Sequence, residues 1–426
     1  MKKKLLLLLC ACMMLGGCSD AGTVKPSEAE KPSTQETQGF QETPVLGESE
    51  EQEIQQVELT DAYQKAAYFA DQVYKEQPGN VLVSPLSLNV ALGMATEGAS
   101  GETAKELYRY LGREDYADWV DEYMSYAENL KASGDGRGGY TFNYKLANSI
   151  WVKKDEKLLK DYQKLVEKKF RAEAENVDFV GEAEKTAQRI NSWCDKHTEG
   201  LIKEVVNPTK FSKELMAILV NSVYFESPWV KEWYQNQHSF TDLQGNKKEQ
   251  DMLFDTLDTY YENDYATAFS KNYYNGFQFI GILPKAEGDF NLGDLDLKSL
   301  LESKTYEYDV KAIMPQLNFE TKTEAVIDVL KAQGVYRAFD EQRAEFYRMI
   351  EDEPLFISKI IQKCKIELDK DGTRAAAVTA IFMEKATSVM DPKMKEVKEV
   401  YLDRPFAFLI YDSQKDQIVF AGKVVK

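Results

Sequence analysis

Residues 372–386 place the strongest constraint on how this chain can fold. At every second position from Thr373 to Met383 the residues are small or apolar and uncharged, whereas the alternate positions include Arg374 and Glu384. Successive side chains of a β-strand point to opposite faces, so this pattern is typical of a strand with one buried face. Alanine is also the best helix former, and the stretch alone therefore leaves a helix or a loop open as well.

The first residues have the organisation of a bacterial export signal. A basic start at residues 2–4 precedes an apolar run to Leu15, which is too short to span a bilayer as a helix. Residues 1–17 are therefore predicted to be a signal peptide. The run ends in a Leu-Gly-Gly-Cys tetrapeptide that resembles a lipobox, so we expect its cysteine, Cys18, to be lipidated. An ordinary secretion signal with an incidental cysteine is the alternative.

A polar tether and one folded domain are expected after the signal. Residues 18–57 are rich in Glu, Pro, Ser, Thr and Gln, with Phe40 as the only aromatic residue, and such a segment cannot bury enough apolar surface to fold. We expect it to be a lipidated, disordered acidic tether. Residues 58–426 contain no internal repeat and are expected to form one domain. The protein is thus expected outside the cytoplasm, as a cell-surface or membrane-anchored bacterial lipoprotein.

Charge and cysteine content narrow the possible partners. The formal net charge of −18 makes nucleic acid an unexpected partner, because the phosphates would be repelled. Cys10 and Cys12 leave with the predicted signal, so Cys194 and Cys364 are the cysteines of the domain. These residues imply no disulfide framework, and whether they pair stays open.

Apolar periodicity predicts a mixed α+β fold. Helical spacing predicts three helices, at residues 67–73, 85–95 and 183–196. Ser84 is the expected N-cap of the second helix, and Pro85 suits its first turn. Short β-rich runs predict four strands, at residues 217–225, 277–283, 406–411 and 418–425.

The sequence offers little catalytic chemistry. The chain has two histidines, His197 and His238, and neither lies in a motif typical of serine or cysteine hydrolases. Cys194 and His197 share the spacing i, i+3 on a predicted helix, but two ligands alone make a weak metal site. We therefore expect no metal, no cofactor and no enzymatic activity. A secreted hydrolase that uses one of the histidines as its base is the remaining alternative.

Several separated motifs resemble the serpin family. The sequence Gly-Thr-x-Ala-Ala-Ala that starts at Gly372 is similar to the family's mobile hinge. Other similar motifs occur in the family's order, at residues 80–88, 98–103, 146–152, 190–200, 220–229, 404–410 and 420–422. The resemblance therefore extends over the whole predicted domain.

This resemblance implies a serpin-like α+β fold, with a large mixed or antiparallel main β-sheet, surrounding helices and a mobile reactive-centre loop. It also implies a suicide-type inhibitor of serine proteases, with cysteine proteases as a further target class. A protease that attacks the loop forms an acyl-enzyme, and insertion of the cleaved loop into the main sheet traps it. The implied partners are elastase-, subtilisin- or trypsin-like proteases, the lipid anchor is the implied contact with a membrane, and a monomer is expected.

The resemblance assigns functional roles to individual residues. The hinge comprises Gly372, Thr373, Arg374, Ala375, Ala376, Ala377, Val378 and Thr379. The regions called shutter and breach, where the sheet opens, comprise Ser84, Ser87, Asn148, Asn221, Trp229 and Gln362. Counting from the hinge places the reactive bond between Ala386 and Thr387, with Lys385 as the alternative.

Three features depart from the family pattern. The segment between Ala386 and Pro405 is long, which leaves other cleavage points open. Lys370 stands where the family usually has Glu, and Gln316 where it has a basic partner, so that ion pair is expected to be absent. Gln362 replaces a histidine, and an amide keeps the hydrogen bonds but loses the imidazole's titration.

A non-inhibitory binding protein with a serpin fold is the alternative function. Non-inhibitory members tend to carry bulky or charged residues where this chain has Ala375, Ala376 and Ala377. The hinge therefore favours an inhibitor.

Overall fold

The computed structural model describes residues 56–134, 142–351, 355–373 and 395–426. The described residues belong to one compact folded unit. Its α-helices are α1 (Ala62–Glu76), α2 (Pro85–Gly98), α3 (Gly101–Leu111), α4 (Tyr116–Gly134), α5 (Lys160–Phe170), α6 (Ala183–His197), α7 (Leu297–Glu302) and α8 (Val326–Ala332). No helix within these ranges is long and apolar enough to cross a membrane.

The strands form three sheets. They are β1 (Val81–Val83), β2 (Asn143–Lys153), β3 (Glu173–Val177), β4 (Ala217–Pro228), β5 (Tyr234–Thr241), β6 (Lys247–Leu257), β7 (Tyr260–Glu262), β8 (Ala266–Asn272), β9 (Phe277–Pro284), β10 (Tyr308–Pro315), β11 (Leu317–Thr323), β12 (Lys359–Leu368), β13 (Gly372–Thr373), β14 (Glu396–Tyr401), β15 (Phe406–Asp412) and β16 (Gln417–Val424). The main sheet has the order β11-β12-β13-β4-β2-β3, the second β1-β16-β15-β9-β8-β7, and the third β14-β10-β6-β5.

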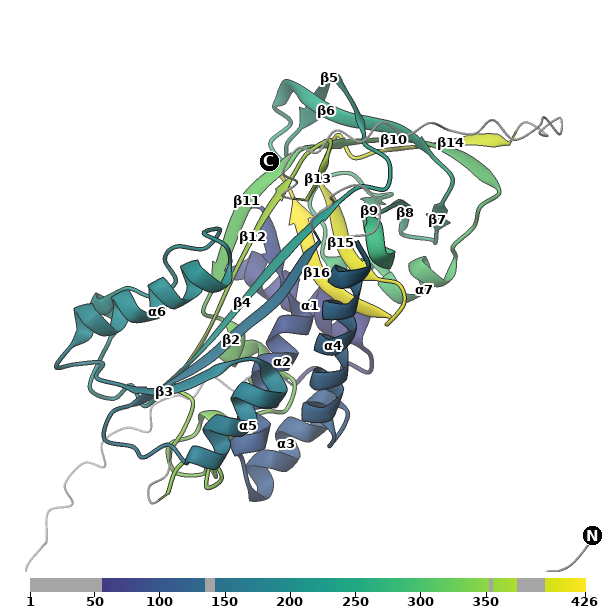
Figure 1. Ribbon diagram of the computed structural model, residues 1–426. Helices are drawn as coiled ribbons and strands as arrows, with labels where there is room; N and C mark the ends of the chain where they lie inside the picture. The colour runs from purple at the N-terminus through teal and green to yellow at the C-terminus, as the bar shows by residue number, and fades with distance from the viewer. Residues whose placement is uncertain (1–55, 135–141, 352–354, 374–394) are drawn as a thin grey trace, which may run out of the picture. The chain divides into compact units, whose positions relative to one another are not determined.

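The main sheet is mixed and lies between two layers. β4 pairs with β2 in antiparallel and with β12 in parallel orientation, while β2 pairs with β3 in parallel. Helix α6 covers one face, and α1 and α2 lie on the other (Figure 1). Each face has its own apolar cluster, because alternate side chains of β4 and β12 point to opposite sides.

The predicted elements recur with small shifts at their ends. Ser84 caps α2, since its side-chain oxygen accepts a hydrogen bond from the Ser87 N–H, and Pro85 is the first helical residue. Almost every residue of α2 is buried, as expected for a helix that crosses the interior. The helix predicted at 183–196 is α6, and the four predicted strands are β4, β9, β15 and β16. The predicted mixed α+β fold with a large main sheet is confirmed.

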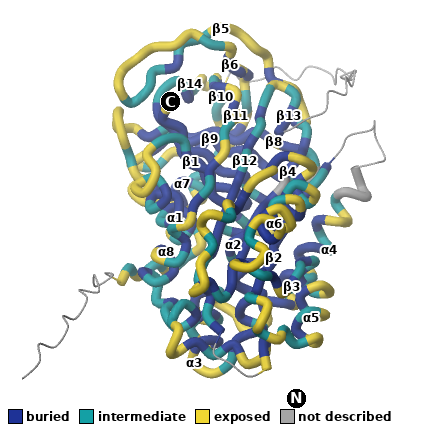
Figure 2. Tube along the Cα trace, turned by 90° about the vertical axis from the view of Figure 1, so that its left-hand side faces the viewer, coloured by how far each residue is buried: buried dark blue, intermediate teal, exposed yellow. Residues whose placement is uncertain are grey.

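Burial differs sharply between the sheets. β12 and β4 are buried along most of their length, whereas most of β5 is exposed to solvent (Figure 2). β5 lies at one edge of the third sheet and pairs only with β6 among the strands that the structure describes. Any rearrangement of β12 and β4 must therefore displace side chains that pack against them on both faces. The third sheet, in contrast, has a face that is open to solvent.

Candidate functional site

The candidate site is the seam between β12 and β4 at the centre of the main sheet. At its lower end the two strands pair directly, from Lys359 opposite Ile218 to Lys363 opposite Ser222. At its upper end they separate, and the two residues of β13 lie between them. Thr373 pairs with Leu368 on one side and with Ser227 on the other. The upper seam thus already contains the beginning of an additional strand.

A tight turn leads from β12 into β13. The side chain of Asp369 accepts hydrogen bonds from the N–H groups of Asp371, at 2.9 Å, and Gly372, at 3.1 Å. The Asp369 N–H donates to the Gly372 carbonyl at 2.9 Å. Asp side chains often stabilise turns in this way, by accepting from their own backbone two residues ahead.

Two tryptophans hold this turn against the rest of the molecule. The indole N–H of Trp229 donates to the Asp369 carbonyl, and its backbone N–H donates to that of Asp371. The backbone N–H of Trp233 donates to the Lys370 carbonyl at 2.9 Å. The predicted breach residue Trp229 therefore contacts the start of the predicted hinge directly.

Thr373 points into the interior, as its strand pattern predicts. It is 3% exposed, and its hydroxyl lies 2.6 Å from the hydroxyl of Tyr273. The ring of Tyr273 stacks on Trp229, with 4.0 Å between ring centroids, and burial raises the pKa of the Tyr273 hydroxyl. Any larger or charged side chain at position 373 would have to displace this packing.

The other predicted loop residues lie outside the described residues. They are the hinge residues Arg374, Ala375, Ala376, Ala377, Val378 and Thr379 and the reactive-bond residues Lys385, Ala386 and Thr387. Cys18 also lies outside them.

The predicted shutter residues come together beneath the lower seam. Asn221 on β4 donates to the Ser87 hydroxyl at 2.7 Å and to the Asn148 side-chain oxygen at 2.6 Å, and it accepts from Gln362 at 2.5 Å. Gln362 on β12 also exchanges two hydrogen bonds with the backbone of Ser84. We call these five residues the polar cluster. All are at most 1% exposed, so their bonds are made in a dry interior.

The two unusual residues near the turn are not partners. Lys370 pairs with its neighbour Asp371 at 2.6 Å, and this hydrogen bond raises the pKa of the Lys370 ammonium. Gln316 lies between β10 and β11, where it lines a cavity of about 440 Å³. The ion pair that the family pattern would place here is replaced by a local one within the turn.

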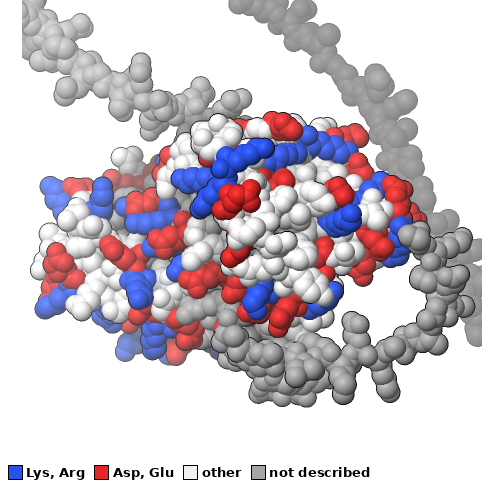
Figure 3. Space-filling model, turned by 90° about the horizontal axis from the view of Figure 1, so that it is seen from above, with Lys and Arg blue, Asp and Glu red and all other residues white. Residues whose placement is uncertain are grey.

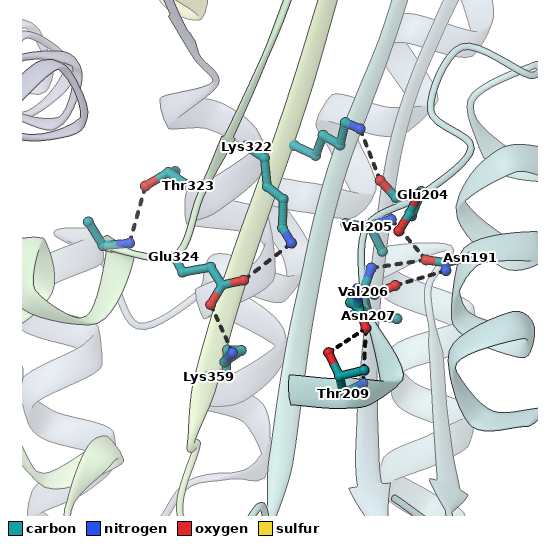
Figure 4. Close-up of polar contacts among 12 residues, drawn as sticks. Asn191, Glu204, Val205, Val206, Asn207, Thr209, Lys322, Thr323, Glu324 and Lys359 are labelled. Carbon is teal, nitrogen blue, oxygen red and sulfur yellow. Dashed lines mark hydrogen bonds and ion pairs between the residues drawn. The ribbon is translucent and has the colours of Figure 1, made fainter. Parts of the chain in front are cut away.

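Sequence reasoning missed the segment that crosses over the lower seam. Residues 198–216 follow α6, and Asn191 fixes them to that helix by accepting from the N–H groups of Val205 and Val206 (Figure 4). We call them the crossing segment. The Lys363 ammonium donates to the Glu204 carbonyl at 3.0 Å and pairs with Glu320 at 3.1 Å. Nothing in the sequence singles out Lys363 for this contact, because β12 also contains Lys359 and Lys365.

The crossing segment also packs on both sides of the seam. Its apolar residues, among them Val205 and Val206, belong to one cluster with Val220 of β4 and Ile361 of β12. Beside it, an ion-paired group of Lys322, Glu324 and Lys359 links β11 to β12 (Figure 4). The lower seam is therefore covered on this face by side chains from several elements.

The cysteines and histidines make local contacts in the described part of the chain, among them that of His238, whose Nε2 atom lies 3.2 Å from a carboxylate oxygen of Asp403. Cys194 lies 3.9 Å from the Ser222 hydroxyl under α6, and burial raises the pKa of its thiol to about 12. His197 contacts the carbonyl of Trp193 through its Nδ1 atom. No group of three or more His, Cys, Asp or Glu side chains in this part could hold a metal ion. Cys364 belongs to the cluster on the opposite face of the sheet, and both thiols are free.

A main sheet whose central strands separate around the first residues of another strand defines a protein of the strand-insertion class. Residues 64–426 match the family model described as serpin (serine protease inhibitor). The chain belongs to the serpin family.

Curated relatives and solved structures agree with this assignment. An uncharacterized serpin-like protein of Thermococcus kodakarensis is 29% identical, with 100% of this chain and 99% of the relative covered. The leukocyte elastase inhibitor of Xenopus laevis is 29% identical over 81% of this chain and 92% of its own length. The crystal structure of the thermophilic serpin tengpin superimposes with a TM-score of 0.71 at 26% identity, covering 88% of this chain and 96% of that one. Family and fold together support a protease-inhibitor type of function in general.

Proposed function

We propose that this protein inhibits serine proteases, and cysteine proteases by the same route, as a suicide substrate. The observation that carries the proposal is β13, because Gly372 and Thr373 already occupy the upper seam in strand geometry. Continuing this strand downward would place the next residues between β12 and β4. The alternation of small residues after Thr373 suits that path, since one face of the new strand would be buried.

The proposed reaction begins at the bond between Ala386 and Thr387, or one residue earlier at Lys385. The nucleophile of the protease attacks the carbonyl carbon, the new amino terminus departs, and an ester or thioester joins the inhibitor to the protease. The fifteen residues from Gly372 to Ala386 reach about 50 Å as a strand, at about 3.3 Å per residue. Insertion over that length would carry the bound protease along the sheet before water releases it.

The residue on the acyl side of the bond determines the target. A small Ala386 suits elastase- and subtilisin-like proteases with shallow apolar pockets, whereas Lys385 suits trypsin-like enzymes. Incubation with one protease of each type, followed by a denaturing gel, tests the proposal. We expect a covalent complex with at least one of them, and mass spectrometry of the released C-terminal fragment identifies the bond. Cleavage without any complex would favour the non-inhibitory alternative.

We also propose that the inhibitor is anchored outside the cytoplasm. The apolar run, the lipobox-like tetrapeptide and the polar residues 18–57 support this location. Cys18→Ala is expected to abolish labelling by radioactive palmitate and to release the protein from the membrane fraction. Retention of both properties in the variant would contradict the anchor and leave the inhibitory mechanism untouched.

A further inference from the structure

The outer face of the third sheet carries a row of apolar side chains across all four strands. The strand register aligns Tyr234 of β5 with Phe254 of β6, Phe254 with Ile313 of β10, and Ile313 with Tyr401 of β14. Tyr234 is 57% and Phe254 38% exposed, and their rings stack with 5.6 Å between centroids. Because neighbouring strands lie about 4.8 Å apart, the row extends over about 14 Å.

The row lies in a cavity of about 540 Å³. Pockets of roughly 300–1,000 Å³ lined by apolar and aromatic groups with a few polar groups are typical of sites for small organic molecules. Met252 contributes to the lining beside Phe254, and Asn236 and His238 line one flank of the row. This cavity is separate from the seam of the main sheet and from every residue assigned to inhibition.

The opposite flank of the row is cationic. Lys311, whose partner across the strands is Thr256, and Lys231 both line the cavity. Lys231 shares the carboxylate of Asp255, at 3.2 Å, with the buried ammonium of Lys271, at 2.7 Å. One carboxylate therefore faces two ammonium groups, which leaves a net positive charge at this flank.

The second lysine is also available to a ligand. Lys311 pairs with Glu399 at 3.4 Å, and both side chains are more than half exposed, so this surface ion pair contributes little. Figure 3 views this end of the folded unit and shows basic side chains in a band, with acidic and uncharged side chains beside it. In a chain with a formal net charge of −18, two lysines at the edge of an apolar row are complementary to a small amphipathic anion.

We propose that this cavity binds a small organic anion with an elongated aromatic body and an acidic group on one long edge. The body stacks along the row from Tyr234 to Tyr401, in the offset arrangement that aromatic rings prefer. The acidic group lies between Lys231 and Lys311. The site is independent of the proposed inhibitory function, and its test requires no protease.

A matched pair of fluorescent probes tests both parts of the proposal. 8-Anilinonaphthalene-1-sulfonate has the aromatic body and the anion, and N-phenyl-1-naphthylamine has the same body without the anion. We expect one sulfonate probe to bind per chain with micromolar affinity, and the neutral probe to bind about tenfold more weakly, the effect of losing two nearby ammonium partners at a protein surface. Equal affinities for the two probes would contradict the proposal that Lys231 and Lys311 bind the acidic group.

Variants locate the site. Phe254→Ser is expected to weaken both probes about tenfold, because a stacking ring and its apolar area are lost. The matched control is Tyr265→Ser, since Tyr265 is 53% exposed and is not part of the row, and we expect it to leave binding unchanged. Thermal unfolding of each variant verifies that it is folded. If Phe254→Ser and Tyr265→Ser lowered the affinity for the probes equally, the probes would not bind at the row, and the proposed site would be wrong.

The lysines are tested in the same way. Lys231→Gln and Lys311→Gln are each expected to weaken the sulfonate probe about threefold to fivefold and to leave the neutral probe unchanged, as expected for one exposed charge pair. Lys247→Gln, on the far end of β6, is the charge control and should have no effect. If sedimentation showed a dimer that excludes the probe, the face would instead belong to a second copy of the chain, and the proposal would be wrong.

Discussion

The two ends of the seam between β12 and β4 are closed in different ways. At the upper end, β13 separates the strands, and Thr373 fills the space between Leu368 and Ser227. At the lower end the strands pair directly, with the polar cluster on one face and the crossing segment on the other. The upper end is therefore arranged to accept a strand, and the lower end must be disrupted before a strand can enter.

This difference separates the start of insertion from its progress. The upper end requires only that side chains of the hinge fit against Tyr273 and Trp229. The lower end requires the loss of the direct pairing from Lys359 to Lys363 and of the contacts that bridge it. Substitutions at the upper end should therefore decide whether insertion begins, and substitutions at the lower end how stable the closed state is and how fast it opens.

Thr373→Arg should have the largest effect. The side chain at this position is 3% exposed, and burial of an unpaired guanidinium costs several kcal/mol, so insertion would lose the competition with hydrolysis of the acyl-enzyme. We expect covalent complex to fall by about tenfold or more while cleavage of the loop continues, because each 1.4 kcal/mol changes a rate about tenfold. Densitometry of a denaturing gel measures both products.

The control for this variant is Lys370→Arg, in the turn that precedes the hinge. The Lys370 side chain is 46% exposed, so an arginine there remains in water. Unchanged complex formation is expected. If Thr373→Arg inhibited as well as the parent, the inward orientation of position 373 would not matter for insertion.

Asn221→Ala tests the closed lower end. It removes three buried hydrogen bonds and leaves partners on Ser87, Asn148 and Gln362 unsatisfied, which we expect to lower the free energy of unfolding by about 2–4 kcal/mol. The midpoint of urea unfolding measures the loss. The exposed Asn318 on β11 provides the control, and its replacement by Ala should shift the midpoint hardly at all. If the two variants shifted the midpoint equally, the polar cluster would contribute no more to stability than an exposed asparagine does.

Lys363→Met tests the crossing segment. Methionine keeps the length and apolar stem of the side chain but loses the bonds to the Glu204 carbonyl and to Glu320. We expect spontaneous loss of inhibitory activity on warming to become about fivefold faster, which corresponds to about 1 kcal/mol of the barrier to opening. Lys365→Met is the control, because Lys365 pairs with Glu367 on its own strand. Equal rates for both variants would show that the contact with Glu204 does not slow the opening.

The sequence predicted one of the two strands of the seam, β4, but neither β12 nor the way the seam is closed. The spacing of apolar residues identified α2, α6 and β4, and motifs identified Thr373 and the polar cluster. The two-residue β13 has no local signal, because its pairing to Ser227 and Pro228 joins residues far apart in the chain. The bond from Lys363 to a backbone carbonyl also has no sequence signature, since any residue could supply that carbonyl.

The third sheet illustrates the same limit. Its strands mix polar and apolar residues, and only the register of four strands brings Tyr234, Phe254, Ile313 and Tyr401 into one row. Local periodicity predicts which face of a single strand is apolar, but it carries no information on which residue lies opposite in another strand. The position of β13 between β12 and β4 and the apolar row both depend on which residues lie opposite each other in neighbouring strands.

The smallest predicted effect concerns the thiol of Cys194 beneath α6. Burial raises its pKa to about 12, above the value of about 8.5 for a free thiol. Its contribution to stability is therefore fully present below about pH 8.5 and is lost as the pH rises toward 12, because the unfolded chain ionises first.

Between pH 7 and pH 9 we expect this thiol to account for a loss of about 0.8 kcal/mol in the free energy of unfolding. Burial also lowers the pKa of the Lys271 and Lys423 ammonium groups, so the parent is compared with Cys194→Ala at both pH values, and the difference between the two losses isolates the thiol. A difference near zero would mean that water reaches Cys194 in the native state, and that α6 and the crossing segment do not keep the lower seam dry.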